Sequence, residues 1–351
     1  MISRIFSFAV LAGLSAFANT ALAAGDCPGN PGALGTSRTI VVDPAEHARV
    51  GTMQYAETLP LHDREVVLTF DDGPLPAHTN AILDILASQC IKATFFMVGR
   101  MAKEFPETVR RVHDEGHTIG THSENHPFHF GEMTPEKIKS EIDDGIAHVT
   151  EALGDTSHLA PFFRIPGLRR SETVETYLAG LGIMVWSADF PADDWRHISS
   201  TQVVRLALSR IQAKGKGILL LHDIQERTLI ALPVILRELK ARGYRIVHVV
   251  PATPQTPKTP TDPQQWVFNV ASAGTPMARL SSQSVSLARA PLPSPSSQLA
   301  FGSPVSETSI FGAATGSKPI SELSQSASHL KVPGSWPIAA TGFRLGSPES
   351  E

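Results

Sequence analysis

The sequence predicts an α/β fold built on a parallel sheet, and two observations over residues 60–252 support this. Apolar segments of strand length recur at regular intervals, and segments of helical periodicity fill the gaps between them. Strands that alternate with helices along the chain pair in parallel and are buried on both faces. A doubly wound open sheet and a (β/α) barrel both fit this alternation.

Seven apolar segments are predicted as strands, and in chain order they are 66–70, 93–98, 117–121, 162–166, 183–188, 218–222 and 245–250. Helical patterns occupy residues 78–90, 106–116, 134–154, 199–215 and 229–243. Thr134 followed by Pro135 is typical of a helix start, and Gly154 is typical of a helix end. Gly215 and Gly243 are expected to end two further helices.

The two ends of the chain differ from this regular middle. Residues 1–23 combine an early arginine, an apolar stretch and a small-residue ending, which predicts a secretory signal peptide and an exported, periplasmic or extracellular protein. Residues 24–60 are then a leader before the domain at 61–252. Residues 253–351 hold 13 prolines and 19 serines, a composition that favours a disordered tail. No later segment is long and apolar enough to be a transmembrane helix.

The net charge of −4 excludes the basic surface expected of a nucleic-acid-binding protein. The chain has two cysteines, Cys27 and Cys90. In an exported protein they can form a disulfide, which would contribute about 4 kcal/mol for a loop of this length. Two free thiols remain the alternative.

Ionisable side chains follow five of the seven predicted strands. In folds of this class the carboxyl ends of the strands meet at one rim, where sites are built. These side chains are Asp71 and Asp72 after the first strand, His122 and His126 after the third, Arg164 in the fourth, Asp189, Asp193 and Asp194 after the fifth, and His222 and Asp223 at the sixth. Their shared position favours an active site over a set of surface turns.

A divalent metal site is the first function this rim suggests. His122 and His126 lie four residues apart and can present two imidazoles to one ion, although a surface pair of histidines has the same spacing. With one carboxylate from Asp71 or Asp72 they provide three ligands and leave a position for water. Such a site lowers the pKa of the water and polarises a carbonyl group, which is hydrolytic chemistry.

The other groups then suit acid–base roles. The second aspartate of the Asp71–Asp72 pair would be a general base, held by a charge-assisted hydrogen bond from Arg164. His222 would be a general acid if a neighbouring carboxylate raises its pKa, with Asp194 the first candidate and Asp223 its rival. Trp195 is either a flat wall for a sugar ring or an ordinary packed side chain.

The segments "TFDDGP", "HSENHP", "RIPG", "DDW" and "LLLHD" occur in this order. They resemble the five motifs of the NodB-homology polysaccharide deacetylases, carbohydrate esterase family 4, over residues 61–252. The resemblance implies a distorted (β/α)7 barrel and a divalent metal, usually zinc. It also implies a hydrolase that removes acetyl groups from N-acetylglucosamine units of a glycan.

The resemblance assigns a role to individual positions. It implies that Asp71 is the catalytic base and that Asp72, His122 and His126 hold the metal. His222 matches the general acid of the family.

The remaining assignments concern residues around these groups. Arg164 matches the arginine that orients the base, Asp194 the acid that tunes the histidine, and Trp195 the aromatic wall of the groove. The backbone N–H of Gly167 matches a donor to the oxyanion, although many members carry Tyr at this position. The "DFPADDW" segment is longer than the usual spacing, so Asp189 and Asp193 compete with Asp194.

The implied substrate is an N-acetylglucosamine-containing glycan such as a chitooligosaccharide or peptidoglycan. Two alternatives accompany this interpretation. One is an esterase or amidohydrolase that acts on another acetylated glycan, such as xylan. The other is a non-catalytic barrel that binds glycans.

Overall fold

The structure is a computed structural model that describes residues 27–268. The predicted signal peptide and the chain beyond residue 268 lie outside these residues. The strands are β1 (Thr36–Val42), β2 (Arg49–Val50), β3 (Glu65–Asp71), β4 (Thr94–Met97), β5 (Thr118–Thr121), β6 (Phe162–Phe163), β7 (Met184–Trp186), β8 (Phe190–Pro191), β9 (Gly217–His222) and β10 (Arg245–Pro251). The helices are α1 (Pro76–Ser88), α2 (Gly99–Glu104), α3 (Pro106–Asp114), α4 (Pro135–Leu153), α5 (Glu172–Gly180), α6 (Ser200–Lys214) and α7 (Glu226–Ala241).

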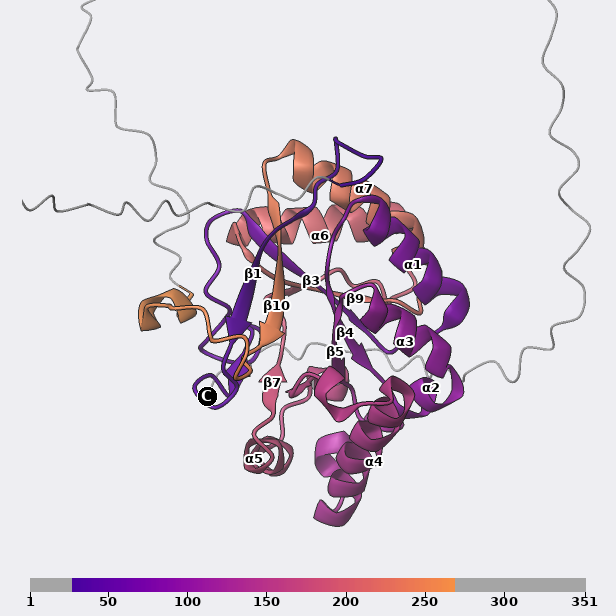
Figure 1. Ribbon diagram of the computed structural model, residues 1–351, viewed down its shortest axis with the longest axis vertical. Helices are drawn as coiled ribbons and strands as arrows, with labels where there is room; N and C mark the ends of the chain where they lie inside the picture. Colours follow the sequence, from indigo (N-terminus) through magenta and orange to yellow (C-terminus); the bar gives the residue numbers. More distant parts are fainter. Residues whose placement is uncertain (1–26, 269–351) are drawn as a thin grey trace, which may run out of the picture. The chain divides into compact units, whose positions relative to one another are not determined.

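All pairings between these strands are parallel, in the order β1-β10-β3-β4-β5-β6-β7-β2. Strand β9 pairs with β3 along its whole length, and β8 pairs with β9. Helices α1 to α4 lie along one flank of the sheet, and α6 and α7 cover another (Figure 1). The arrangement is a distorted (β/α)7 barrel, which confirms the predicted fold class.

Each of the seven predicted strand segments overlaps an observed strand, and each of the five predicted helical segments overlaps an observed helix. Gly154 and Gly215 end α4 and α6 in the left-handed conformation, with φ of 77° and 78°, which glycine adopts without steric cost. Thr134 is the N-cap of α4, but its side chain makes no capping hydrogen bond. Among residues 27–268, no helix is long and apolar enough to cross a bilayer.

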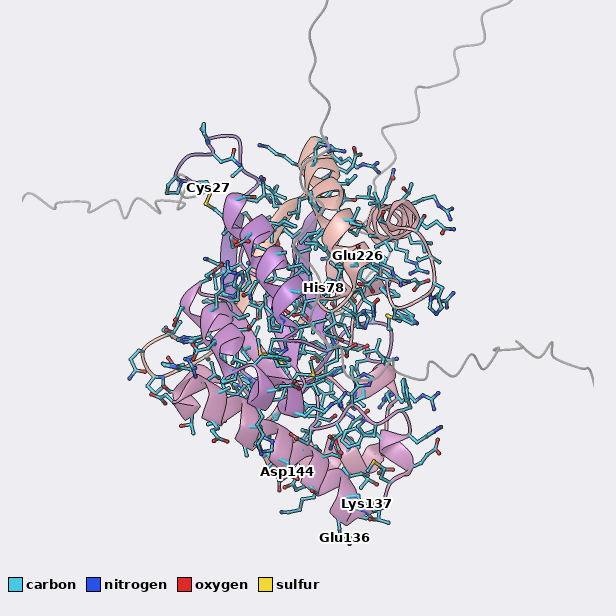
Figure 2. All side chains as sticks on the ribbon, turned by 90° about the vertical axis from the view of Figure 1, so that its right-hand side faces the viewer. Cys27, His78, Glu136, Lys137, Asp144 and Glu226 are labelled. Carbon is cyan, nitrogen blue, oxygen red and sulfur yellow. A yellow bond between two sulfur atoms is a disulfide. The ribbon has the colours of Figure 1, made fainter. Side chains whose placement is uncertain are left out.

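The segment 24–60, predicted as a leader, contributes two strands to the sheet. Strand β1 pairs with β10, and β2 pairs with β7. The side chains of Ile40, Val42 and Val50 are buried in the core. Cys27 forms a disulfide with Cys90, next to the end of α1, and its sulfur is visible at the upper end of the molecule in Figure 2. The sheet therefore begins before residue 61.

The first part of the predicted tail also packs on the domain. A 3-10 turn, η4 (Pro263–Trp266), buries Trp266, whose ring stacks on His47 with 3.4 Å between ring centroids. The carbonyl of Trp266 accepts a hydrogen bond from the backbone N–H of Thr58. Part of the segment 253–268 thus packs against the domain. The disorder predicted for the rest of the tail concerns residues outside the described part of the chain.

The side chains of β3 point alternately to the two faces of the sheet, and this alternation positions the site. Val66, Leu68 and Phe70 face the core between sheet and helices, which also contains Leu83 of α1 and Ile235 of α7. The residues between them on the strand point to the opposite face. On that face Val67 packs in the barrel interior with Phe96 and Trp186, and it is followed by Thr69 and Asp71. Strand β3 therefore carries a polar pair toward the rim while its other face stays apolar.

Candidate functional site

The carboxyl ends of β3, β5 and β9 bring the predicted metal and acid–base groups together. Asp71 is the last residue of β3, His122 directly follows β5, and His222 is the last residue of β9. Strand β3 pairs with β9, and Asp71 is the register partner of His222. The groups that meet at this rim are Asp71, Asp72, His122, His126 and His222.

Three of these side chains form a possible metal site. The Oδ1 atom of Asp72 lies 3.4 Å from Nε2 of His122 and 3.4 Å from Nε2 of His126, and the three ligand atoms lie within 4.8 Å of one another. Two ligands about 2.1 Å from a tetrahedrally coordinated ion are separated by about 3.4 Å. Oδ1 of Asp72 is buried and has no hydrogen-bond partner. The residues fit a divalent ion.

The backbone around these ligands is held in an uncommon conformation. Asp72, Ser123 and His126 are non-glycine residues with φ of 78°, 63° and 56°. Such residues cluster at functional sites, where the surrounding structure maintains the strain. The Oγ atom of Ser123 accepts a hydrogen bond from the N–H of His126 at 3.0 Å. His122 donates from Nδ1 to the carbonyl of Arg164 at 2.6 Å, which leaves its Nε2 directed at Asp72.

The electrostatics of the cluster suit metal binding. Burial alone would raise the pKa of Asp72, but the imidazoles of His122, His222 and His126 outweigh it and lower this pKa. Burial and the neighbouring His122 lower the pKa of His126. Asp72 is therefore ionised and His126 tends to be neutral, and these are the protonation states in which both groups bind a metal.

Asp71 is fixed by a fully buried arginine. Nη1 of Arg164 donates to Oδ1 of Asp71 at 2.6 Å and to the hydroxyl of Thr69 at 2.8 Å. Nη2 donates to the carbonyl of Ser187 at 2.9 Å, and the guanidinium lies 4.3 Å from the centre of the Phe96 ring. Oδ2 of Asp71 points toward His122, at 3.9 Å from Nε2. One carboxylate oxygen is anchored and the other faces the possible metal site.

His222 is held by Asp194. Its Nδ1 lies 2.8 Å from Oδ1 of Asp194, and its backbone N–H donates to Oδ2 at 2.7 Å. Thr228, in the first turn of α7, also donates to Oδ2 of Asp194. Burial lowers the pKa of His222, but the charge and hydrogen bond of Asp194 outweigh it and raise the pKa to about 10. Nε2 is left facing Asp72, at 4.0 Å from Oδ2.

The rivals of Asp194 have other partners. Asp189 accepts hydrogen bonds from Thr58 and from the backbone N–H of Ile218, so it ties a loop to β9. Asp193 forms an ion pair with Arg210 of α6 at 2.9 Å.

Asp223 is buried, and its Oδ2 accepts a hydrogen bond from Thr79 of α1 at 2.6 Å. Burial raises its pKa to about 7. Of the candidate carboxylates, Asp194 is the one in contact with the His222 ring.

Trp195 contacts this cluster, and Gly167 lies close in sequence to Arg164. Trp195 is 46% exposed, and its ring meets His222 edge-on with 5.8 Å between centroids. This exposure fits a groove wall better than an ordinary packed tryptophan. Gly167 lies in η3 (Pro166–Leu168), three residues after Arg164, with φ of 62°, which favours glycine.

Sequence reasoning missed the polar groups that hold Arg164 and Asp194 in place. Thr69 lies two residues before Asp71 on the same face of β3, so strand alternation alone could have identified it. Thr228 supports Asp194 from a different element, and no local pattern in the sequence marks it. The same is true of the carbonyl of Ser187, which binds Arg164.

Comparison with known proteins gives one consistent family. The family model "Polysaccharide deacetylase" matches residues 59–186. A peptidoglycan-N-acetylglucosamine deacetylase of Bacillus cereus is 34% identical over 196 residues, which cover 54% of this chain and 89% of that protein. A chitooligosaccharide deacetylase of Rhizobium leguminosarum bv. trifolii is 32% identical, over 52% of this chain and 89% of that protein.

A solved structure supports the same relationship. The peptidoglycan deacetylase of Bdellovibrio bacteriovorus is 32% identical with a TM-score of 0.55, and the match covers 62% of this chain and 60% of that one. The B. cereus relative is matched over most of its length at more than 30% identity. The chain belongs to the polysaccharide deacetylase family.

Proposed function

We propose that this protein is a metal-dependent N-deacetylase that hydrolyses the acetamide of N-acetylglucosamine units in a glycan. The observation that carries the proposal is the joint position of three metal-binding side chains, Asp72, His122 and His126, beside a free oxygen of Asp71 and the Nε2 atom of His222. Amide hydrolysis needs an activated water, a base and an acid, and this arrangement has a group for each.

Asp72, His122 and His126 would hold a divalent ion, with zinc the expected metal, and the bound ion would lower the pKa of a water molecule and polarise the acetamide carbonyl. Asp71 accepts the proton of the attacking water on Oδ2, since Arg164 occupies Oδ1. The water oxygen bonds to the carbonyl carbon, and the C–N bond then breaks.

His222 donates the proton that the departing amine requires. Its Nδ1 is bound to Asp194, so Nε2 is the atom that delivers the proton. The raised pKa of His222 keeps this proton in place at neutral pH. The reaction consumes one water molecule, and its products are acetate and a glucosamine unit.

The remaining residues orient these groups. Arg164 fixes the carboxylate of Asp71, and Asp194 fixes the imidazole of His222. The N–H of Gly167 is the proposed donor to the oxyanion, and Trp195 the wall against which the sugar packs.

A peptidoglycan or chitooligosaccharide substrate follows from the relatives, whose names specify these glycans. Export of the protein, expected from residues 1–23, would bring it to cell-wall glycans. Acetate release from chitin oligomers but not from acetylated xylan would support N-deacetylation over the esterase alternative. Release from neither substrate, with metal bound, would favour the non-catalytic barrel.

The test compares two variants with the wild-type protein for bound metal and for acetate released from a panel of these glycans. Asp71→Asn should retain metal while turnover falls by several orders of magnitude, because the base is lost and the ligands remain. His126→Ala should lose metal, and its activity should fall with the metal content. Near-normal turnover of Asp71→Asn, or full metal content in His126→Ala, would overturn these assignments.

A further inference from the structure

A second aromatic ring stands beside the site, and the mechanism above does not use it. Phe128 follows the metal-binding His126 by two residues and is 73% exposed. Its ring meets the His126 imidazole edge-on, with 5.8 Å between centroids and an interplanar angle of 86°. Phe130, two residues further on, is fully buried and anchors the turn from which Phe128 projects.

A single exposed apolar side chain is ordinary, but the distribution of these side chains is informative. Six large apolar side chains are exposed among residues 27–268, namely Met53, Phe128, Leu181, Trp195, Ile230 and Val267. Two of the six are aromatic, and each contacts the ring of a site histidine, Phe128 at His126 and Trp195 at His222.

The two histidines face different oxygens of one carboxylate. His126 lies 3.4 Å from Oδ1 of Asp72, and His222 lies 4.0 Å from Oδ2. Phe128 and Trp195 therefore stand beside two different edges of the reaction centre. A sugar whose acetamide reaches the centre and packs on Trp195 leaves Phe128 for a neighbouring sugar of the same chain.

The surface of a glycan suits such a ring. The axial C–H groups of a glucosamine unit form an apolar face, while its hydroxyl groups point outward into water. A flat aromatic side chain packs against an apolar face with little loss of conformational freedom. Sugar-binding sites combine such walls with a few polar groups that fix orientation.

We propose that Phe128 forms a binding subsite for a sugar next to the one that is deacetylated, and that it makes the enzyme prefer oligomers to short chains. This inference depends on the proposed function of the same site. Phe128 is a specificity-determining residue, and it takes no part in proton transfer.

The experiment measures kcat and KM on N-acetylglucosamine oligomers from the dimer to the pentamer. Phe128→Ala should raise KM for the tetramer and pentamer about tenfold and leave kcat unchanged, while the dimer changes less than twofold. Phe128→Leu should behave like Phe128→Ala, because it keeps the apolar character and loses the flat ring. Phe128→Tyr should restore the wild-type values.

Leu181→Ala, which truncates an exposed apolar side chain at the end of α5, is the matched control and should not alter KM. Metal content is measured for every variant. A loss of activity equal at all chain lengths, a lower metal content in Phe128→Ala, or an unchanged pentamer KM would each overturn the proposal. The first two outcomes would mean that Phe128 acts through His126.

A binding measurement tests the Phe128 subsite independently of the proposed deacetylase activity. Calorimetric titration of the pentamer into Asp71→Asn, with and without Phe128→Ala, needs no turnover. A tenfold weaker affinity in the double variant supports the subsite even if the wild-type protein released no acetate, a result that would refute the deacetylase proposal alone. Equal affinities would overturn the subsite whatever the activity.

Discussion

Replacing Arg164 with methionine tests the buried ion pair on which the proposed base depends. Methionine fills a similar volume but supplies no charge and no donor. Asp71, whose side chain is 3% exposed, would lose its 2.6 Å partner and remain a buried, uncompensated anion. Thr69 and the carbonyl of Ser187 would lose the same guanidinium.

The expected cost in the free energy of unfolding is about 3–5 kcal/mol, which is typical when one partner of a buried ion pair is removed. The double variant Asp71→Asn, Arg164→Met removes both charges and should be more stable than Arg164→Met alone. A coupling free energy of about 2 kcal/mol or more is expected from the cycle of single and double variants.

Urea unfolding followed by circular dichroism, in the presence of a chelator, measures these differences without a contribution from bound metal. Arg111→Met is the matched control. Arg111 pairs with Asp84 and Glu115 near the surface, where such pairs contribute about 0–1 kcal/mol.

An Arg164→Met variant that loses less than about 1 kcal/mol, or a coupling free energy near zero, would refute the reasoning. Either result would mean that Asp71 is solvated or paired by another group. Activity offers an independent check, because the proposed role of Arg164 predicts a fall in kcat for Arg164→Lys, which keeps the charge but cannot reproduce the planar fork.

Two further predictions concern titration. Asp194→Asn removes the charge that raises the pKa of His222, so the alkaline limb of the pH–rate profile should move to lower pH by at least one unit; an unmoved limb would exclude His222 as the acid. Burial lowers the pKa of His117 to about 3 and of His248 to about 4, so both are neutral in the folded protein. Above about pH 6.5, the pKa of a histidine in the unfolded chain, both side chains are neutral in either state and stability does not depend on them. As the pH falls from there toward 4, only the unfolded chain takes up their protons, and the free energy of unfolding decreases by at most about 1.4 kcal/mol per pH unit for each histidine. Urea unfolding between pH 7 and 5 measures how steeply the free energy of unfolding falls with pH. His248→Gln should make this dependence less steep, and an unchanged dependence would contradict a lowered pKa of His248.

The sequence contains enough information for most of the fold, because long apolar segments and helical periodicity are local signals. What it did not reveal are the short or half-polar elements. In β1 (Thr36–Val42) apolar residues occupy only the last three positions, and β2 and β8 have two residues each. The pairing of such strands is decided by distant neighbours and not by their own composition.

In the candidate site, too, some features could be predicted from the sequence and others depend on distant residues. Strand ends and motif spacing predicted which side chains would meet, and the distances among Asp72, His122 and His126 agree with that grouping. The choice among Asp189, Asp193 and Asp194 could not be made from the sequence, since it depends on which carboxylate turns inward after β7. Thr58 and Arg210, which bind the first two, come from elements 131 and 17 residues away.

The pairing of β1 with β10 has a practical consequence for anyone who wishes to trim this enzyme. The residues in register, such as Thr39 and His248, are separated by almost the whole length of the domain. A shortened chain that began at residue 59, where the family match starts, would remove β1 and leave one edge of β10 unpaired, while its other edge still pairs with β3. An open apolar edge of that kind invites self-association, so the smallest stable fragment has to keep both distant ends.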